Sequence, residues 1–388
     1  MLYTPSFVAM FLANLCTVSS FGAFFLFPLF ITEHGGTEGD IGMIMGSFAL
    51  ASALCRPWVS EMIDRRGRKK SYLAGCLIMT LMPLCYLTFG GELDSFYLPL
   101  IVVRIVHGVG LAICFTAIFT FVADLIPPGR LNEGIGIFGT SGLIGLALGP
   151  LVAEVVLRRF GFPQFFLLAS LLAGSAMLIT LLLPEAYSPH RREAGPSFFQ
   201  VLARRKQLVV ALLALLFGFG LAASGNFVAP MAKVRGLPFI SLYYLAYSAA
   251  AVLVRFGGGR LADRIGEARV LPYALVVTAL GLIALILVHG EASFFAAGFV
   301  AGAGHGLLFP TLNTLAIRNE PPGARGKITG IFTGGIDTGA FIGAILLGYL
   351  GEWGGFDLLF ATSGGALLLG LLVLRFSPAT RPVHSDSK

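Results

Sequence analysis

Apolar segments long enough to cross a lipid bilayer recur along the whole of this 388-residue chain. A helix needs about 20 consecutive apolar residues to span the hydrocarbon core. Hydrophobic residues make up 56% of the chain and charged residues only 12%, too few polar side chains to cover a water-facing globule. We therefore expect an all-α membrane protein with twelve transmembrane helices. The expected spans are residues 6–31, 41–62, 71–89, 98–123, 134–157, 164–183, 208–228, 240–262, 270–289, 294–317, 328–350 and 358–376.

The basic residues between these spans predict how the chain is oriented. The chain has 27 lysines and arginines and a formal net charge of +7. If the N-terminus lies inside the cell, most of them fall in inward loops and in the C-terminal tail, as the positive-inside rule requires. We therefore expect a multi-pass protein of the cytoplasmic (inner) membrane with both termini cytoplasmic. The charge is too sparse for a surface that tracks nucleic acid, so the lipid bilayer is the expected partner.

A charged cassette occurs twice, at the ends of the second and eighth spans. Arg56 stands eight residues before Asp64, and Arg255 stands eight residues before Asp263, with an offset of 199 residues for both members. Each copy ends an apolar run and begins a short charged turn. A cassette repeated half a chain apart indicates an internal duplication, which is how many transporters are built.

Other matches follow in the same order. The Pro-Pro-Gly turn at 127–129 returns at 321–323, and Gly-Ile-Phe begins seven residues after its glycine in each copy. We expect two pseudo-symmetric six-helix bundles, residues 1–183 and residues 208–388, the second ending in a short tail. The charged, proline-containing stretch 184–207 is the expected cytoplasmic linker.

The first copy of the cassette has a specific spacing. Residues 60–69 read S-E-M-I-D-R-R-G-R-K, and the second copy repeats Asp263, Arg264 and Gly266. This spacing matters for a tight turn, whereas charges that only set topology need no fixed spacing. The pattern resembles the loop between helices 2 and 3 of the major facilitator superfamily.

Two further motifs support the resemblance. Arg104 and Gly108 fit the R-x-x-x-G of helix 4 in that family, and Gly145, Gly149 and Pro150 are similar to its antiporter motif in helix 5. The resemblance covers the whole chain. Among subgroups, the chain is most similar to bacterial drug–proton antiporters and sugar-efflux permeases. The resemblance implies the major facilitator fold and transport by alternating access.

The resemblance also implies a gate at the cytoplasmic end, closed in the outward-facing state and open in the inward-facing one. The gate residues that it implies are Asp64, Arg65, Gly67 and Arg68 in the first copy and Asp263, Arg264 and Gly266 in the second, together with Arg56 and Arg255. The alternative is that these charges only set topology. Arg56 and Arg255 lie about 12 Å along a helix from the loop. Each must therefore pair, extend to the interface or face water.

Ionisable residues near the bilayer midplane are the candidates for proton coupling and substrate contact. They are Asp337, Arg104, His107 and His305. No lysine or arginine is near Asp337 in the sequence, so we expect an unpaired buried carboxylate that could carry a proton. The alternative is a static pair with Arg104 or a histidine. Each histidine could also be a hydrogen-bonded packing residue.

Other polar residues in the spans are weaker candidates for the same cavity. They are Glu33 and Glu154 towards the outward ends of helices 1 and 5, and Asn14, Asn226 and Asn313. Glu33 could instead be interfacial, and the asparagines could instead hold helices together by hydrogen bonds.

The favoured function is a proton-coupled exporter of small organic or amphipathic molecules, with Asp337 exchanging a proton for substrate. A second hypothesis is an importer or facilitator of a sugar, organic acid or metallophore, and a third is a non-transporting membrane scaffold or lipid-handling protein. The sequence has no P-loop, nucleophile elbow or metal-ligand spacing, so we expect no enzyme activity, cofactor or metal. The expected partners are a small-molecule substrate and protons, and the expected state is a monomer.

Overall fold

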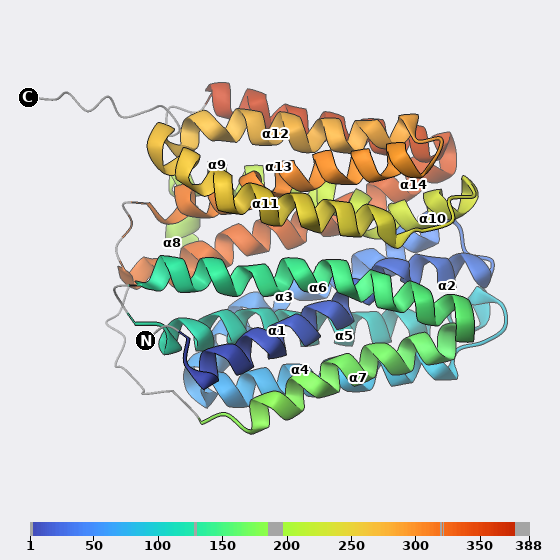
Figure 1. Ribbon diagram of the computed structural model, residues 1–388, viewed down its shortest axis with the longest axis horizontal. Coiled ribbons are helices and arrows are strands. Elements are labelled where there is room, and N and C mark those ends of the chain that lie inside the picture. Colours follow the sequence, from blue (N-terminus) through green and yellow to red (C-terminus); the bar gives the residue numbers. More distant parts are fainter. Residues whose placement is uncertain (1–2, 128–129, 185–196, 319, 321, 377–388) are drawn as a thin grey trace, which may run out of the picture.

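Long helices dominate the computed structural model, which describes residues 3–127, 130–184, 197–318, 320 and 322–376. The side chains at 60, 64, 131–133, 257–265 and 322–326 lie outside this description. The helices run side by side along one direction, and the described residues contain no strand (Figure 1).

The helices are named in chain order. The first ones are α1 (Pro5–Ala23), η1 (Phe24–Leu26), α2 (Phe27–Glu33), α3 (Glu38–Arg66), α4 (Arg68–Cys85), η2 (Tyr86–Thr88), η3 (Leu93–Ser95), α5 (Tyr97–Leu125), α6 (Leu131–Phe160) and α7 (Phe162–Leu181). The others are α8 (Phe198–Leu202), α9 (Arg205–Ala222), η5 (Ala223–Phe227), α10 (Val228–Val234), α11 (Ser241–Ile265), α12 (Glu267–Ala284), η6 (Leu285–Leu287), α13 (Glu291–Ile317) and α14 (Pro322–Phe376).

The predicted membrane spans are confirmed. Within the described residues, ten helices are long and apolar enough to cross a membrane. One of them, Lys327–Phe376, contains two spans, because Gly355 with φ of 73° interrupts its helical geometry. The shorter apolar helix Ser241–Phe256 supplies the remaining span. All twelve expected spans are thus present, with ends that differ from the expected ones by a few residues.

The first span of each half is broken at a similar depth. A 3-10 turn separates α1 from α2, with Pro28 just after it, and the π-helical turn η5 separates α9 from α10, with Pro230 just after it. Proline has no N–H to continue the hydrogen-bond ladder, which favours such a break. Turns of this kind inside helices are frequent at functional sites, and both lie beside the cavity described below.

The two copies of the cassette form the same one-residue turn. Gly67 joins α3 to α4 with φ of 93°, and Gly266 joins α11 to α12 with φ of 87°. Only glycine adopts this backbone conformation without strain. The glycine of the motif is therefore required by the turn itself.

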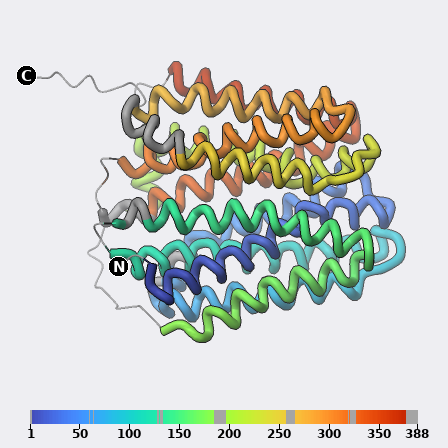
Figure 2. Tube along the Cα trace, viewed as in Figure 1, coloured from blue at the N-terminus to red at the C-terminus, as the bar shows by residue number. Residues whose placement is uncertain are grey.

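Most helix contacts fall within two groups, α1–α7 and α9–α14, which are the two halves seen in Figures 1 and 2. Two extensive contacts join the groups, α3 with α14 and α6 with α11. At the first of these the backbones approach closely, since a Cβ at Gly42 would lie 2.5 Å from the carbonyl oxygen of Ala344. Small residues allow such approach in lipid.

The bundle has two distinct ends. α1 begins and α14 ends at the same end, as an even number of spans requires (Figure 1). We call this the cassette end, because the Gly67 and Gly266 turns lie there, and we call the other the far end, where α3 and α11 begin. The cytoplasmic location of the cassette end stays a prediction.

Candidate functional site

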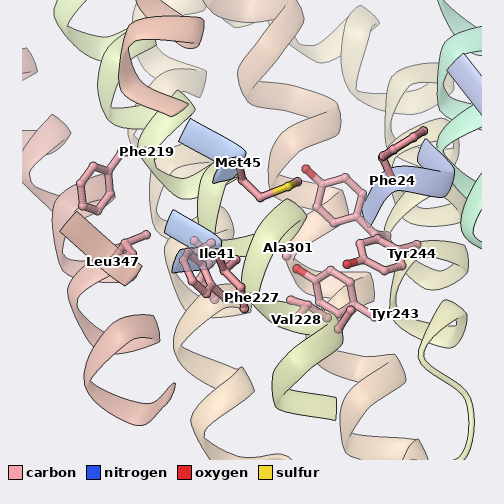
Figure 3. Close-up of a cluster of buried hydrophobic side chains, with 14 of the residues drawn as sticks. Phe24, Ile41, Met45, Phe219, Phe227, Val228, Tyr243, Tyr244, Ala301 and Leu347 are labelled. Carbon is pink, nitrogen blue, oxygen red and sulfur yellow. The ribbon is translucent and has the colours of Figure 1, made fainter. Parts of the chain in front are cut away.

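A cavity of about 230 Å³ lies between the two groups of helices. It is larger than the ~150 Å³ engineered cavity that accommodates benzene. Its wall includes the broken parts of the first and seventh spans, at Phe24, Phe25 and residues 224–226. Phe25 stacks on Tyr244 of the other group, with ring centroids 5.1 Å apart. Figure 3 shows Phe24, Met45 and two tyrosines of α11 gathered from separate elements.

The cavity brings together the four predicted midplane residues and one of the weaker candidates. Those that line it are Asp337, Arg104, His107, His305 and Asn226. They come from α14, α5, α13 and η5, so residues from both halves meet at one place. The wall is otherwise largely aromatic and aliphatic, with a few hydroxyl groups.

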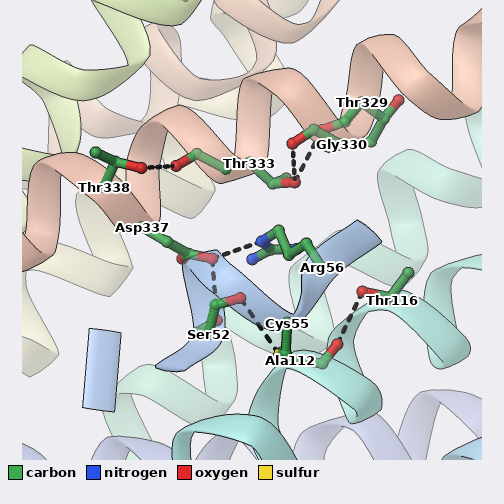
Figure 4. A network of polar contacts seen from close by, with 11 residues as sticks. Ser52, Cys55, Arg56, Ala112, Thr116, Thr329, Gly330, Thr333, Asp337 and Thr338 are labelled. Carbon is green, nitrogen blue, oxygen red and sulfur yellow. Dashed lines mark hydrogen bonds and ion pairs between the residues drawn. The ribbon is translucent and has the colours of Figure 1, made fainter. Parts of the chain in front are cut away.

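Asp337 has a basic partner on the other side of the interface. Arg56 Nε of α3 lies 2.5 Å from Asp337 Oδ2, and Ser52 Oγ donates to the same oxygen at 2.9 Å (Figure 4). The Arg56 and Asp337 side chains are only 16% and 18% exposed. The expectation of an unpaired carboxylate is therefore wrong, and so is the alternative that its partner is Arg104 or a histidine. Arg56, expected only in the gate, therefore contacts a carboxylate of the cavity wall, although it does not itself line the cavity.

The sequence indicates the face of α3 that makes this contact, but not its partner. Ser52 and Arg56 are four residues apart, so they lie on one face of α3. That face packs on α14, where Asp337 is the single acidic residue of its span. The pairing itself required knowledge of which helices cross.

Arg104 is buried without a carboxylate partner among the described residues. It is 1% exposed, and its guanidinium packs on the rings of Phe24, Phe27 and Phe48, with Cζ 4.4 Å from the Phe48 centroid. Nη2 lies 3.2 Å from Met45 Sδ. Nε and Nη1 have no hydrogen-bond partner in the described part of the chain.

Each of the two histidines is paired with a tyrosine. Tyr86 Oη lies 3.2 Å from His107 Nδ1, and Tyr247 Oη bonds His305 Nδ1. Both imidazoles are buried among aromatic rings, which include Phe24 for His107. The two pairs are alike in chemistry but are not strict repeats, because Tyr86 follows α4 whereas Tyr247 lies within α11.

Comparison with known proteins decides the family. The sequence model of the major facilitator superfamily matches residues 9–289 and 239–388. The chain belongs to the major facilitator superfamily. It is therefore a multi-pass membrane transporter, and the resemblance found in its motifs is confirmed.

Relatives and solved structures agree with this membership. The transporter is 26% identical over 311 residues to the multidrug resistance protein MdtG of Serratia proteamaculans, covering 77% of this chain and 74% of that one. It is 22% identical over 349 residues to an uncharacterized MFS-type transporter of Methanocaldococcus jannaschii, covering 84% and 86%. The nucleoside transporter NupG shares the fold, with a TM-score of 0.79, 13% identity and coverage of 95% and 98%. A POT family transporter gives a TM-score of 0.80 at 15% identity, covering 96% of both chains.

Glu154 lies outside the cavity wall, at the far end of the transporter. Its carboxylate accepts hydrogen bonds from the backbone N–H groups of Ile240 and Ser241, at 2.9 and 2.7 Å, and from Arg158. Ser241 begins α11 and Ile240 directly precedes it, so Glu154 of α6 caps a helix of the other group. A carboxylate at a helix N-terminus satisfies free N–H groups and the helix dipole. Its position favours a structural contact over the predicted cavity role.

The remaining weaker candidates also lie apart from the cavity. Glu33 is exposed at the end of α2. Asn14 donates to Ser141 Oγ at 2.7 Å and so links α1 to α6, as expected of an asparagine between helices. Asn313 lies in α13, where its Oδ1 is buried without a partner in the described residues.

The predicted gate residues divide between the loop and the interface. Arg65 bonds Glu61 of its own helix, and Arg68 bonds Asp124 of α5, so both bonds lie in the first group. Arg255, by contrast, reaches across the interface to the carbonyl of Gly139 at 3.5 Å. The side chains of Asp64, Asp263 and Arg264 lie outside the described residues.

The motif in the fifth span, Gly145, Gly149 and Pro150, lies in α6 and holds this helix against α1. A Cβ added at Gly145 would lie 2.9 Å from Val18 Cβ, and one added at Gly149 would lie 2.3 Å from the carbonyl oxygen of Ser19. Pro150 approaches the same helix at Gly22. The motif therefore serves close packing within the first half, and none of its three residues lines the cavity.

Proposed function

We propose that this transporter is a proton-coupled exporter of small, amphipathic organic molecules. It would work by alternating access between two bundles, residues 1–183 and 208–388, connected by the linker 184–207. The observation that carries the proposal is the bond from Arg56 to Asp337, because it joins a carboxylate on the cavity wall to the opposite half.

The chemistry of this pair supports coupling. An ionised Asp337 attracts Arg56 and Ser52 and so holds α3 against α14. Protonation of Asp337 removes the charge from one side of the pair and weakens that attachment. A proton that enters the cavity thereby changes the free energy of the contact between the halves, which is the requirement for coupling proton entry to a conformational change.

The far end supplies the second element of alternating access. There the halves meet at the backbone contact between Gly42 and Ala344 and at the Glu154 cap on α11. Both contacts must break for the cavity to open at that end. Under the predicted orientation this is the outward side, so the described state would be the one closed to the outside.

The substrate class rests on the cavity wall and on the relatives. The wall carries several phenylalanines and tyrosines with few polar groups, which suits an amphipathic guest. Relatives named multidrug resistance proteins over most of this chain's length support export of such compounds.

Reconstituted vesicles test the proposal. Vesicles that contain the transporter, a luminal pH dye and an inward proton gradient are presented with aromatic compounds of differing charge. We expect proton movement that depends on a transported compound, and we expect Asp337→Asn to abolish it while leaving the protein folded. Asp357→Asn is the matched control, since Asp357 pairs with Arg235 at the exposed far end.

Two results would contradict the proposal. Full proton-coupled transport by Asp337→Asn would remove Asp337 from the mechanism. Uptake of a compound down its own gradient, indifferent to pH in the wild-type protein, would instead favour an importer or facilitator.

A further inference from the structure

The charges of the cavity do not balance. Asp337 is the single carboxylate on the described wall, and it is already paired with Arg56. Arg104 is the guanidinium that lines the same wall, and no described carboxylate pairs with it. Arg56, Arg104 and Asp337 together therefore carry one net positive charge.

Arg104 is not accounted for as a structural residue. A guanidinium has five N–H donors, and in a membrane interior it is expected to pair, reach the interface or face water. Arg104 is 1% exposed, and its Nε and Nη1 have no partner in the described residues. Its nearest groups are a thioether, aromatic rings and the Tyr86 hydroxyl, none of which carries a negative charge.

The surroundings of Arg104 define a ligand. The rings of Phe24 and Phe48 hold the guanidinium plane in place, and both residues also line the cavity. Nε and Nη1 are shielded from the cavity, so an anion must displace the side chains that cover them to supply the missing acceptors. An apolar body attached to that anion would then meet the adjacent rings. A charge-assisted bond of this type is the strongest polar contact available to Arg104.

We propose that the substrate is an organic anion, a carboxylate or sulfonate on an aromatic or other apolar body, whose acidic group binds Arg104. This inference rests on the proposed transport function and specifies its substrate class. A neutral substrate leaves the N–H groups of Arg104 unsatisfied. A cationic substrate must approach two guanidinium groups while the one nearby carboxylate is occupied by Arg56.

A matched pair of ligands tests the charge directly. 1-Naphthalenesulfonate and 1-naphthalenesulfonamide have nearly the same shape, and only the first is an anion. Calorimetric titration of the purified full chain is expected to show the sulfonate binding at least about ten-fold more tightly than the sulfonamide. 1-Naphthyltrimethylammonium, the cationic counterpart, is expected to bind most weakly.

Variants of Arg104 test whether this residue causes the preference for the anion. Arg104→Met keeps the volume and removes the charge, so it should bring the two affinities within about three-fold by weakening the sulfonate alone. Arg104→Lys keeps the charge and should retain the preference for the anion. Lys233→Met, which removes an exposed cation outside the cavity, should change neither affinity.

Several outcomes would overturn the inference. In the wild-type protein, these are equal affinities for the sulfonate and the sulfonamide, tightest binding of the cation, or no sulfonate binding up to about 10 mM, beyond the weak end of specific affinities. In Arg104→Met, the outcome is an unchanged preference for the sulfonate. Binding is measured without a proton gradient, so sulfonate binding without proton-coupled flux would contradict the proposed function alone. Proton-coupled export of a cation would contradict the anion inference alone.

Discussion

Arg56 Nε and Asp337 Oδ2 lie 2.5 Å apart, although the two residues are 281 positions apart in the sequence. The bond connects the two halves of the transporter at the wall of its cavity. It is largely shielded from solvent, with side-chain exposures of 16% and 18%. A proton or a substrate that acts on this carboxylate therefore acts on the contact between the halves.

This contact should give a measurable coupling energy. In a double-mutant cycle of Arg56→Gln and Asp337→Asn, followed by thermal unfolding, we expect an interaction of about 0.5–3 kcal/mol. The pair Arg65–Glu61 is the matched control, because its distance is also 2.5 Å but its side chains are 76% and 58% exposed. Solvent screening should limit that coupling to about 0.5 kcal/mol. Additive effects of the Arg56 and Asp337 substitutions would contradict the coupling.

The turn of the cassette should require glycine only because of its backbone conformation. Gly266 has φ of 87°, and a Cβ added there meets no atom within 4 Å. Gly266→Ala should therefore destabilise the protein through backbone strain by about 1–3 kcal/mol. Gly136→Ala is the control, since that helical glycine also has open space around it, and alanine favours a helix. Equal melting temperatures for the two variants would show that φ is not the cause.

The helix 5 motif should act through packing. A Cβ at Gly149 would lie 2.3 Å from the Ser19 carbonyl, whereas at Gly142, two turns earlier in α6, the nearest atom is 3.7 Å away. We expect Gly149→Ala to lower the free energy of unfolding by about 1–3 kcal/mol, with little change for Gly142→Ala. Thermal unfolding in detergent measures both. Loss of transport without loss of stability in Gly149→Ala would instead point to a direct role in the transport cycle.

Glu154 should stabilise the closed far end. Glu154→Ala leaves the N–H groups of Ile240 and Ser241 without their acceptor, and the loss of such a cap typically costs about 0.5–2 kcal/mol. Because the cap bridges the halves, we also expect spin labels on α6 and α11 to report wider distances at that end. Glu33→Ala is the control, an exposed carboxylate at the end of α2. Unchanged distances in Glu154→Ala would contradict its role in closure.

Local and repeating features of this protein were predictable from the sequence. The membrane spans follow from the length of the apolar segments. The turn at Gly67 follows from the cassette, which places a glycine where the backbone has a positive φ. The cavity residues were predictable as a set, because few ionisable residues occur at midplane depth. Their partners were not, since the bond from Arg56 to Asp337 depends on which helices cross. Glu154 shows the same limit, because the N–H groups that it caps belong to the other half.

Transport of an anion should depend strongly on membrane potential. Export of a monovalent anion in exchange for an entering proton moves two charges in the same electrical sense per cycle. Each charge contributes about 2.3 kcal/mol per 100 mV, so an inside-negative potential should drive the exchange markedly. The measurement uses vesicles with a potassium potential set by valinomycin. We expect two net charges to cross the membrane per proton during transport of 1-naphthalenesulfonate, and one during transport of 1-naphthalenesulfonamide. Movement of the sulfonate together with a proton is electroneutral, so absence of current during sulfonate transport would identify uptake by symport and contradict export.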